Sequence, residues 1–235
     1  MKGENNSFLR NYYKSKMISR WNEEESFFYE NGFYLTSKQT RMSNLLAHYD
    51  LYKKIVDLPG DIVELGVFKG ASLIQFATYR NILEGEFARK VIGFDMFGEF
   101  PQATNEMDKI FREEWVAETN NEYLTIEELR RALKYKGLNN VELIKGDICE
   151  TLSYYLQNNP FLRVAMLHID TDIYEPSKVG LEMLYDRVVP GGIIVFDDYG
   201  VAGETEAVDE LICAKNYTLH KMKNAYFKPV YLQKE

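Results

Sequence analysis

The sequence has few cysteines and no long apolar run. Cys149 and Cys213 are too few for a disulfide framework in a chain of 235 residues, and their separation does not suit a metal-binding pair. No apolar stretch approaches the ~20 residues of a transmembrane helix. The first six residues, MKGENN, are polar and lack the apolar region of a secretory signal. We therefore expect a cytoplasmic protein, in a reducing compartment, without a membrane segment.

Basic residues are fewer than acidic residues. The chain has 28 lysines and arginines against 36 acidic residues, which gives a formal net charge of −8. Nucleic-acid binding depends on a cationic surface that neutralises phosphates, so no nucleic acid is expected as a partner. A content of 46% apolar and 14% aromatic residues argues against disorder. The length suits one α/β domain with a large core.

Two apolar runs near the C-terminus end in carboxylates. One run precedes Asp170 and Asp172, and the other precedes the doublet Asp197-Asp198. Both resemble buried parallel strands, and residues 176–185 between them are long enough for one crossover helix, so the strands can be neighbours. Clustered carboxylates are costly without a counter-charge, which a hard divalent cation with oxygen ligands supplies. The sequence therefore predicts a metal site in an α/β enzyme.

The rest of the chain alternates between strand and helix patterns. Strands are predicted at residues 61–65, 91–94, 141–144, 164–169 and 191–196. Helices are predicted at residues 41–56, 71–83, 126–136, 151–157, 176–185 and 206–215. This alternation predicts a doubly wound, Rossmann-like α/β sheet that is mostly parallel and binds its ligands at the carboxyl ends of the strands. Residues 217–222 and 226–232 predict a C-terminal hairpin that forms an antiparallel edge.

Two segments stand apart from this alternation. Residues 1–57 have a helical pattern with interleaved aromatic and charged residues, and we expect them to form a helical cover before a single structural unit at residues 58–235. Residues 99–123 are charged and aromatic with little strand character, which suits a mobile lid or an insertion. Thr125, with Glu128 three positions later, has the pattern of a capping box at the start of a helix.

A glycine-containing loop closes the first strand. The run ELGVFKGAS at residues 64–72 includes Gly66 and Gly70, which allow a tight turn and a close backbone approach to a ligand. It lacks the Gly-x-Gly-x-x-Gly spacing that cradles a pyrophosphate. Asp95 ends the second strand, where an acidic residue typically accepts two hydrogen bonds from a ribose diol. Asp147 ends the third strand and is either a partner of a purine amino group or an ordinary turn residue.

In this order, these segments resemble the class I S-adenosylmethionine-dependent methyltransferases, and more narrowly the macrocin O-methyltransferase (TylF/MycF/NovP) family. The matching runs, which span about residues 36–210, are PGDIVELGVFKG, FDMFGEFP, IKGD, HIDTDIY and PGG followed by DDY. The resemblance implies methylation of a saccharide hydroxyl with S-adenosylmethionine and Mg²⁺, with Mn²⁺ as a possible substitute, by a homo-oligomer. Family members commonly have an arginine after the double aspartate, where this chain has the run ETEAV at residues 204–208.

The resemblance and the strand positions together suggest roles for individual residues. The predicted metal ligands are Asp170, Asp197 and Asp198. The predicted cofactor-binding residues are Glu64, Gly66, Gly70, Ser72, Asp95, Asp147 and Ile148. Asp172 is the predicted general base, because it lies just beyond the strand end. His168 is the alternative base, although its position within the strand favours a buried supporting role, and packing is favoured for His48.

Two other enzyme classes share parts of this pattern. A catechol or caffeoyl-CoA type O-methyltransferase uses a similar acidic pattern but usually has an Asp-Asn pair in place of Asp197-Asp198. An NAD-dependent sugar-modifying oxidoreductase would share the fold and Asp95, but the glycine spacing and the lack of an obvious Tyr-x-x-x-Lys pair oppose it. A non-catalytic binding module would have no need of clustered carboxylates.

Overall fold

A twisted sheet of seven strands forms the centre of the computed structural model, which describes residues 21–215, 217–223 and 229–235. The strands are β1 (Asp61–Leu65), β2 (Val91–Asp95), β3 (Val141–Lys145), β4 (Val164–Ile169), β5 (Val188–Phe196), β6 (His220–Lys221) and β7 (Val230–Gln233). They lie in the order β3-β2-β1-β4-β5-β7-β6. The first five strands are parallel, and β7 pairs antiparallel with both β5 and β6. The predicted sheet and its antiparallel edge are confirmed, whereas residues 224–228 of the predicted hairpin lie outside the described residues.

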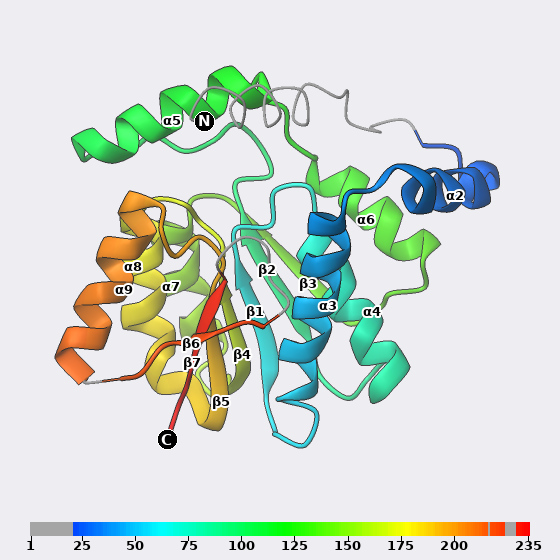
Figure 1. Cartoon of the computed structure of the whole chain (residues 1–235). Coiled ribbons are helices and arrows are strands. Elements are labelled where there is room, and N and C mark those ends of the chain that lie inside the picture. The colour runs from blue at the N-terminus through cyan, green and yellow to red at the C-terminus, as the bar shows by residue number, and fades with distance from the viewer. Residues whose placement is uncertain (1–20, 216, 224–228) are drawn as a thin grey trace.

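Helices cover both faces of the sheet (Figure 1). They are α2 (Ser26–Thr36), α3 (Gln39–Lys53), α4 (Ala71–Leu83), α5 (Glu106–Thr119), α6 (Ile126–Tyr135), α7 (Ile148–Asn158), α8 (Tyr174–Leu184) and α9 (Ala202–Lys215), with short 3₁₀ turns at Glu23–Glu25 and Tyr185–Arg187. One apolar core lies between the sheet and α3, α4 and α6. A second core lies between the sheet and α7, α8 and α9. Burial of both faces explains why β4 is apolar along nearly its whole length.

Local capping explains where several helices begin. Thr125 accepts the N–H of Glu128 at 3.3 Å, and the Glu128 carboxylate accepts the N–H of Thr125 at 2.9 Å, so the predicted capping box is confirmed. Helix α7 begins three residues earlier than predicted, because the Asp147 carboxylate accepts the N–H of Cys149 at 2.8 Å and caps it. Helix α8 includes Pro176 in its first turn, where no backbone N–H is needed.

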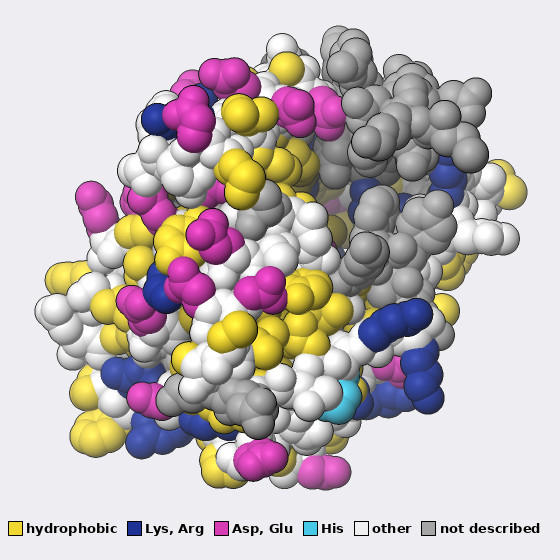
Figure 2. Space-filling view, turned by 60° about the vertical axis from the view of Figure 1, so that its left-hand side comes forward, with side chains coloured by type: hydrophobic (Ala, Val, Ile, Leu, Met, Phe, Trp, Pro, Cys, Tyr) yellow, Lys and Arg dark blue, Asp and Glu magenta, His cyan; other side chains and the backbone are white. Residues whose placement is uncertain are grey.

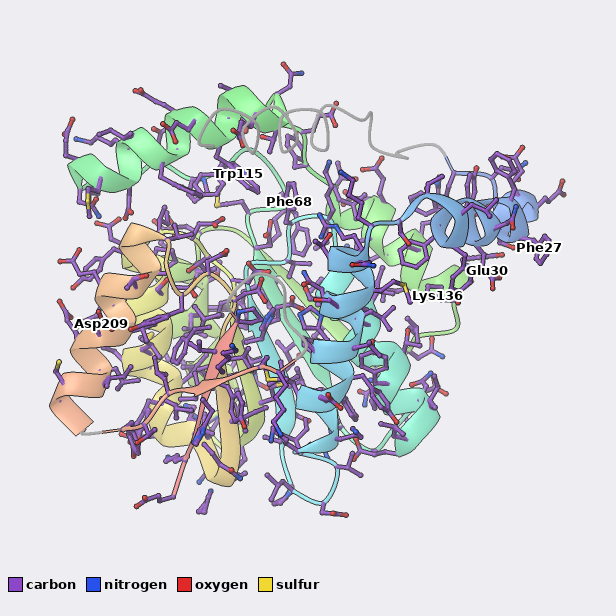
Figure 3. All side chains as sticks on the ribbon, viewed as in Figure 1. Phe27, Glu30, Phe68, Trp115, Lys136 and Asp209 are labelled. Atoms are coloured by element: carbon purple, nitrogen blue, oxygen red, sulfur yellow. The ribbon has the colours of Figure 1, made fainter. Side chains whose placement is uncertain are left out.

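The segment predicted as a lid or insertion contains helix α5. Asn105 caps the helix by accepting the N–H of Asp108 at 2.8 Å. The buried Asp108 carboxylate in turn accepts the N–H of Tyr174 at 2.8 Å. Farther along, the Trp115 ring lies edge-on to Phe68 with 5.4 Å between the ring centroids, and Figure 3 shows these two side chains below the helix. Helix α5 is therefore anchored both to the glycine-containing loop and to the connection between β4 and α8.

The two helices of the N-terminal cover differ in burial. Helix α3 contributes Ala47, His48, Leu51 and Tyr52 to the interior, where it packs on α4. Helix α2 has no buried residue, and the large apolar side chains Phe27, Phe28, Phe33, Tyr34 and Leu35 are exposed. Figure 3 shows Phe27 pointing away from the rest of the chain. Residues 1–20 of the predicted cover lie outside the described residues, and the boundary near residue 57 stays a prediction.

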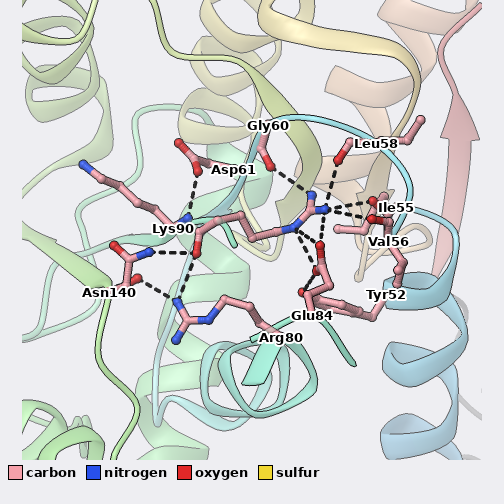
Figure 4. Close-up of polar contacts among 11 residues, drawn as sticks. Tyr52, Ile55, Val56, Leu58, Gly60, Asp61, Arg80, Glu84, Lys90 and Asn140 are labelled. Atoms are coloured by element: carbon pink, nitrogen blue, oxygen red, sulfur yellow. Dashed lines mark hydrogen bonds and ion pairs between the residues drawn. The ribbon is translucent and has the colours of Figure 1, made fainter. Parts of the chain in front are cut away.

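The buried Arg89 side chain contacts several loops at the amino ends of the strands, and Figure 4 shows the polar contacts in this region. The Arg89 guanidinium donates to both carboxylate oxygens of Glu84, with a shortest distance of 2.6 Å. It also donates to the carbonyls of Gly60 at 2.9 Å, Leu58 at 2.9 Å and Ile55 at 3.1 Å. Arginine suits this position because its planar group has five donors in a fixed geometry.

We expect Arg89→Met to lower the free energy of unfolding by about 3–5 kcal/mol, because it leaves the largely buried Glu84 carboxylate, whose side chain is 11% exposed, without its charge partner. Urea denaturation followed by circular dichroism measures this change. Lys109→Met is the control, because the half-exposed Lys109 pairs with Glu106 of the same helix and its substitution should cost no more than about 0.5 kcal/mol. Equal effects of the two substitutions would contradict the assigned role of Arg89.

Candidate active site

The register of the central strands brings the predicted acidic residues together. Leu65, Ile169 and Phe196 end β1, β4 and β5, and Ile169 pairs with Leu65 on one side and with Phe196 on the other. The backbone hydrogen bonds of the sheet continue for one more residue. The N–H of Asp170 donates to the carbonyl oxygen of Leu65 at 2.9 Å, and the N–H of Asp197 donates to that of Ile169 at 3.0 Å. Asp170 and Asp197 are therefore fixed side by side by backbone hydrogen bonds.

The three predicted metal ligands form one cluster of oxygen atoms. Asp170, Asp197 and Asp198 each offer a carboxylate oxygen, and these atoms lie within 4.8 Å of one another. Burial, followed by the negative charge of Asp197, raises the pKa of Asp170 well above its ordinary value and that of Asp198 to about 6. This repulsion is the physical reason to expect a cation here. An all-oxygen set of this kind fits Mg²⁺ or Mn²⁺.

Asp172 lies just beyond this cluster in an unusual backbone conformation. Its φ of +62° is in the left-handed region, which costs free energy for a residue other than glycine and is often found at functional sites. Burial, followed by the negative charge of Asp198, raises the pKa of Asp172 well above its ordinary value. The structure thus places the predicted base next to the predicted metal ligands.

Glu204 is a fifth carboxylate of the site, and the sequence did not indicate it. It lies in the first turn of α9 and is fully buried. Its carboxylate accepts the N–H of Asp198 at 3.1 Å and that of Thr171 at 3.4 Å, so it joins the loops that follow β4 and β5. A glutamate in the first turn of a helix usually lies at the surface, where its negative charge interacts favourably with the helix dipole. Its only signal in the sequence was the departure from the family pattern at residues 204–208.

Two histidines approach the cluster from the α3 side of the sheet. Alternate residues of a strand face the same side, so His168 of β4 and Asp170, one residue beyond the end of β4, share a face. His168 is fully buried, with Nδ1 3.3 Å from Glu64 Oε1 and Nε2 3.6 Å from Asp197 Oδ1. Burial lowers the pKa of His168, but the Asp197 and Glu64 carboxylates outweigh it and raise the pKa to about 10. His48 reaches the same place from α3, with Nε2 3.8 Å from Asp197 Oδ1.

The glycine-containing loop is positioned by contacts that only glycine permits. Gly66 has a φ of +87°, and a Cβ at this position would lie 1.8 Å from the carbonyl oxygen of Asp170. Gly70 has a φ of +76° and begins α4 without a side-chain cap. Gly66 therefore brings the backbone of this loop close to the acidic cluster, and Gly70 supplies the left-handed backbone at the start of α4.

Asp95 holds this loop in place. Its Oδ2 accepts the N–H groups of Val67 at 2.8 Å and Phe68 at 2.9 Å, and its Oδ1 accepts that of Phe97 at 2.6 Å. A carboxylate has about four acceptor positions, so one remains here for a ligand hydroxyl. Three of the four positions are occupied by the loop backbone. The Asp95 carboxylate therefore has one free position for a ribose diol, where two were expected.

The remaining predicted cofactor residues lie along the same edge of the sheet. Glu64 is fully buried and accepts a hydrogen bond from Ser72, and its Oε2 has no hydrogen-bond partner among the described residues. A buried carboxylate oxygen of this kind fits a ligand ammonium group. Asp147 is exposed at the cap of α7, and Ile148 is buried beside it.

The surface near the site is acidic, as the overall charge suggests. Figure 2 shows acidic side chains gathered on the face that α5 and α9 form. A groove of about 700 Å³ on this face is lined by Met107, Gly200, Thr205, Glu206, Asp209, Glu210 and Cys213. In the part of the chain that the structure describes, no helix combines the length and apolar character needed to cross a membrane.

Comparisons with known proteins agree with this arrangement. The family model described as macrocin-O-methyltransferase (TylF) matches residues 30–234. A tetracenomycin-C 4'-O-methyltransferase of Streptomyces olivaceus, whose full name refers to a 2,3-dimethoxy-α-L-rhamnosyl group, is 32% identical over 158 residues, which are 65% of this chain and 58% of that protein. Mycinamicin III 3''-O-methyltransferase of Micromonospora griseorubida is 31% identical over 160 residues, which are 65% of this chain and 60% of that protein. The matched part of the chain thus spans less than two thirds of either relative.

Solved structures show the same similarity in three dimensions. CalS11, described as a calicheamicin methyltransferase, superimposes with a TM-score of 0.70 and 26% identity, covering 98% of this chain and 91% of that chain. Its apo structure is described as a TDP-rhamnose 3'-O-methyltransferase and has a TM-score of 0.66. The family match covers most of the sequence and includes the glycine-containing loop and all five acidic residues of the site. The chain belongs to the macrocin-O-methyltransferase family.

Proposed function

We propose that the protein is an S-adenosylmethionine- and Mg²⁺-dependent O-methyltransferase that methylates a saccharide hydroxyl. The observation that carries this proposal is the cluster of Asp170, Asp197 and Asp198 at the strand ends, next to the Gly66 loop. The names of the relatives support the acceptor class, because one refers to a rhamnosyl group and another to TDP-rhamnose.

The cofactor is proposed to lie across the carboxyl ends of β1, β2 and β3. Glu64 would accept the ammonium group through its unpartnered oxygen, while Ser72 and the Gly66–Gly70 backbone hold the amino-acid end. Asp95 would accept one ribose hydroxyl, and Asp147 with Ile148 would contact the adenine. S-adenosylmethionine supplies the methyl group on a sulfonium, so the enzyme must supply a deprotonated acceptor oxygen.

The acidic cluster is proposed to prepare that oxygen. A divalent cation held by Asp170, Asp197 and Asp198 would orient two neighbouring hydroxyls and lower the pKa of one of them. Asp172 would then remove the proton as the general base. Glu204 would support both groups, because it holds the backbone N–H groups of Asp198 and Thr171.

A homo-oligomer is proposed as the working assembly. The exposed apolar side chains of α2, among them Phe27, Phe28 and Leu35, support this proposal, because large apolar residues grouped on one element are typical of interaction surfaces. Residues of α2 and α3 and the α5 segment would then surround the acceptor pocket.

Identification of a co-purified ligand tests the proposed class of enzyme. Because the proposed site pairs the cofactor's ammonium group with the buried Glu64 carboxylate, we expect mass spectrometry of the denatured protein to detect S-adenosylhomocysteine or S-adenosylmethionine. Gly66→Val is the matched control, since its side chain would collide with the Asp170 carbonyl and exclude the cofactor. Release of a nicotinamide dinucleotide would instead favour the oxidoreductase alternative.

A further inference from the structure

Two of the three histidines of the chain converge on one carboxylate oxygen. The Nε2 atoms of His48 and His168 lie 3.8 Å and 3.6 Å from Asp197 Oδ1. The three potential ligand atoms all lie within 4.8 Å of one another. The two histidines come from α3 and β4, which are far apart in the sequence, so their meeting is a product of the fold.

The other nitrogen of each imidazole already faces an oxygen acceptor. His48 Nδ1 lies 2.8 Å from Gln75 Oε1, and His168 Nδ1 lies 3.3 Å from Glu64 Oε1. In this arrangement Nδ1 of each ring can donate to its oxygen acceptor, and Nε2 of each ring is directed at Asp197. His168 Nε2 is fully buried and has no hydrogen-bond partner among the described residues. A ring held at Nδ1 by an amide or carboxylate oxygen, with Nε2 directed inward, is the usual arrangement of a metal-binding histidine.

An aromatic side chain packs against both imidazole rings and holds them in this orientation. The Phe76 ring packs against His48 and His168, with 5.1 Å and 5.4 Å between ring centroids. The two imidazoles lie edge to face, with 5.7 Å between their centroids. The site is therefore built from buried and oriented side chains.

We propose that His48, His168 and Asp197 form a second cation site, which selects a transition metal such as Zn²⁺ and shares Asp197 with the oxygen-only cluster. Two imidazole nitrogens and one carboxylate oxygen suit Zn²⁺ and leave a fourth position open, whereas the all-carboxylate cluster suits Mg²⁺. Binding displaces the proton at His168 Nε2, because a metal-bound imidazole donates that nitrogen's lone pair. Metal binding at this second site does not depend on methyl transfer.

Titration with ZnCl₂ tests this proposal. The untagged chain is first stripped of metal and then saturated with Mg²⁺. We expect one Zn²⁺ to bind by calorimetry, and His48→Gln to weaken that binding at least about tenfold, because one of three ligands is lost. Gln75→Leu should weaken it about 10–100-fold, because the acceptor that orients His48 is removed. His220→Gln is the matched control, because this third histidine is exposed on β6 and stacks on Tyr231.

Pulsed electron paramagnetic resonance with Cu²⁺ as the probe counts the imidazole ligands directly. The parent chain and His220→Gln should both show two coupled imidazoles, and His48→Gln should show one. Asp198→Asn should weaken Mg²⁺ binding and leave the nitrogen signal unchanged, because Asp198 belongs only to the oxygen cluster. Unchanged Zn²⁺ affinity and an unchanged Cu²⁺ nitrogen signal in His48→Gln would overturn the proposal, as would Zn²⁺ binding that depends on Asp198 alone.

Discussion

The substitution Asp172→Asn is expected to lower kcat by about 10²–10⁴, the usual effect of removing a general base. An alcohol reacts poorly with a sulfonium methyl group until its proton is removed, and an amide cannot take that proton. Cofactor and Mg²⁺ affinities should stay near those of the parent, because Asp172 is not among the three clustered ligand residues. Steady-state kinetics and calorimetry on the same preparation separate these effects.

Controls distinguish a lost base from general damage to the site. Asp186→Asn removes an exposed carboxylate far from the cluster and should leave kcat unchanged. His168→Gln should lower activity through the position of Asp197, with an accompanying change in Mg²⁺ affinity. Near-parental turnover by Asp172→Asn, combined with an inactive His168→Gln that still binds Mg²⁺ normally, would assign the base to His168 instead.

Removal of divalent cations is expected to abolish activity. Asp170, Asp197 and Asp198 repel one another when no cation is bound, and the proposed cation is the group that would orient both hydroxyls of an acceptor diol. Exhaustive dialysis against EDTA should reduce turnover to the background rate, and added Mg²⁺ or Mn²⁺ should restore it without Zn²⁺ by binding at the oxygen cluster. Asp198→Asn should raise the Mg²⁺ concentration needed for half-maximal rate.

A surface carboxylate serves as the matched control for this experiment. Glu206 lies two residues after Glu204 on the same helix but is exposed, so Glu206→Gln should need the same Mg²⁺ concentration as the parent. Turnover that survives complete chelation, in the parent and in Asp198→Asn alike, would remove the cation from the proposed reaction.

The fold and the acidic cluster could be predicted because their signals are local. Buried parallel strands are continuous apolar runs, and the carboxyl ends of neighbouring strands meet at one edge. The positions of Asp170 and Asp197 follow from these two facts alone. The capping box at Thr125 was predicted for the same reason, because a helix N-terminus is defined by residues within one turn.

Contacts between distant elements could not be predicted in the same way. The meeting of His48 with Asp197 depends on how α3 packs on α4, and periodicity marks His48 only as a residue of a buried face. Asp95 accepts three backbone N–H groups because of the loop path after β1, which has no residue pattern of its own. Glu204 is buried because α9 begins at the end of the Asp197-Asp198 turn, a position that residue type alone does not reveal.

Mass spectrometry of the reaction products tests the central proposal most directly. The parent enzyme is incubated with S-adenosylmethionine and Mg²⁺ and offered either TDP-rhamnose with related saccharides or a set of catechols. We predict a saccharide product that is heavier by one methylene group, formed together with S-adenosylhomocysteine and absent after chelation. Methylated catechols without any methylated saccharide would contradict the proposed acceptor class.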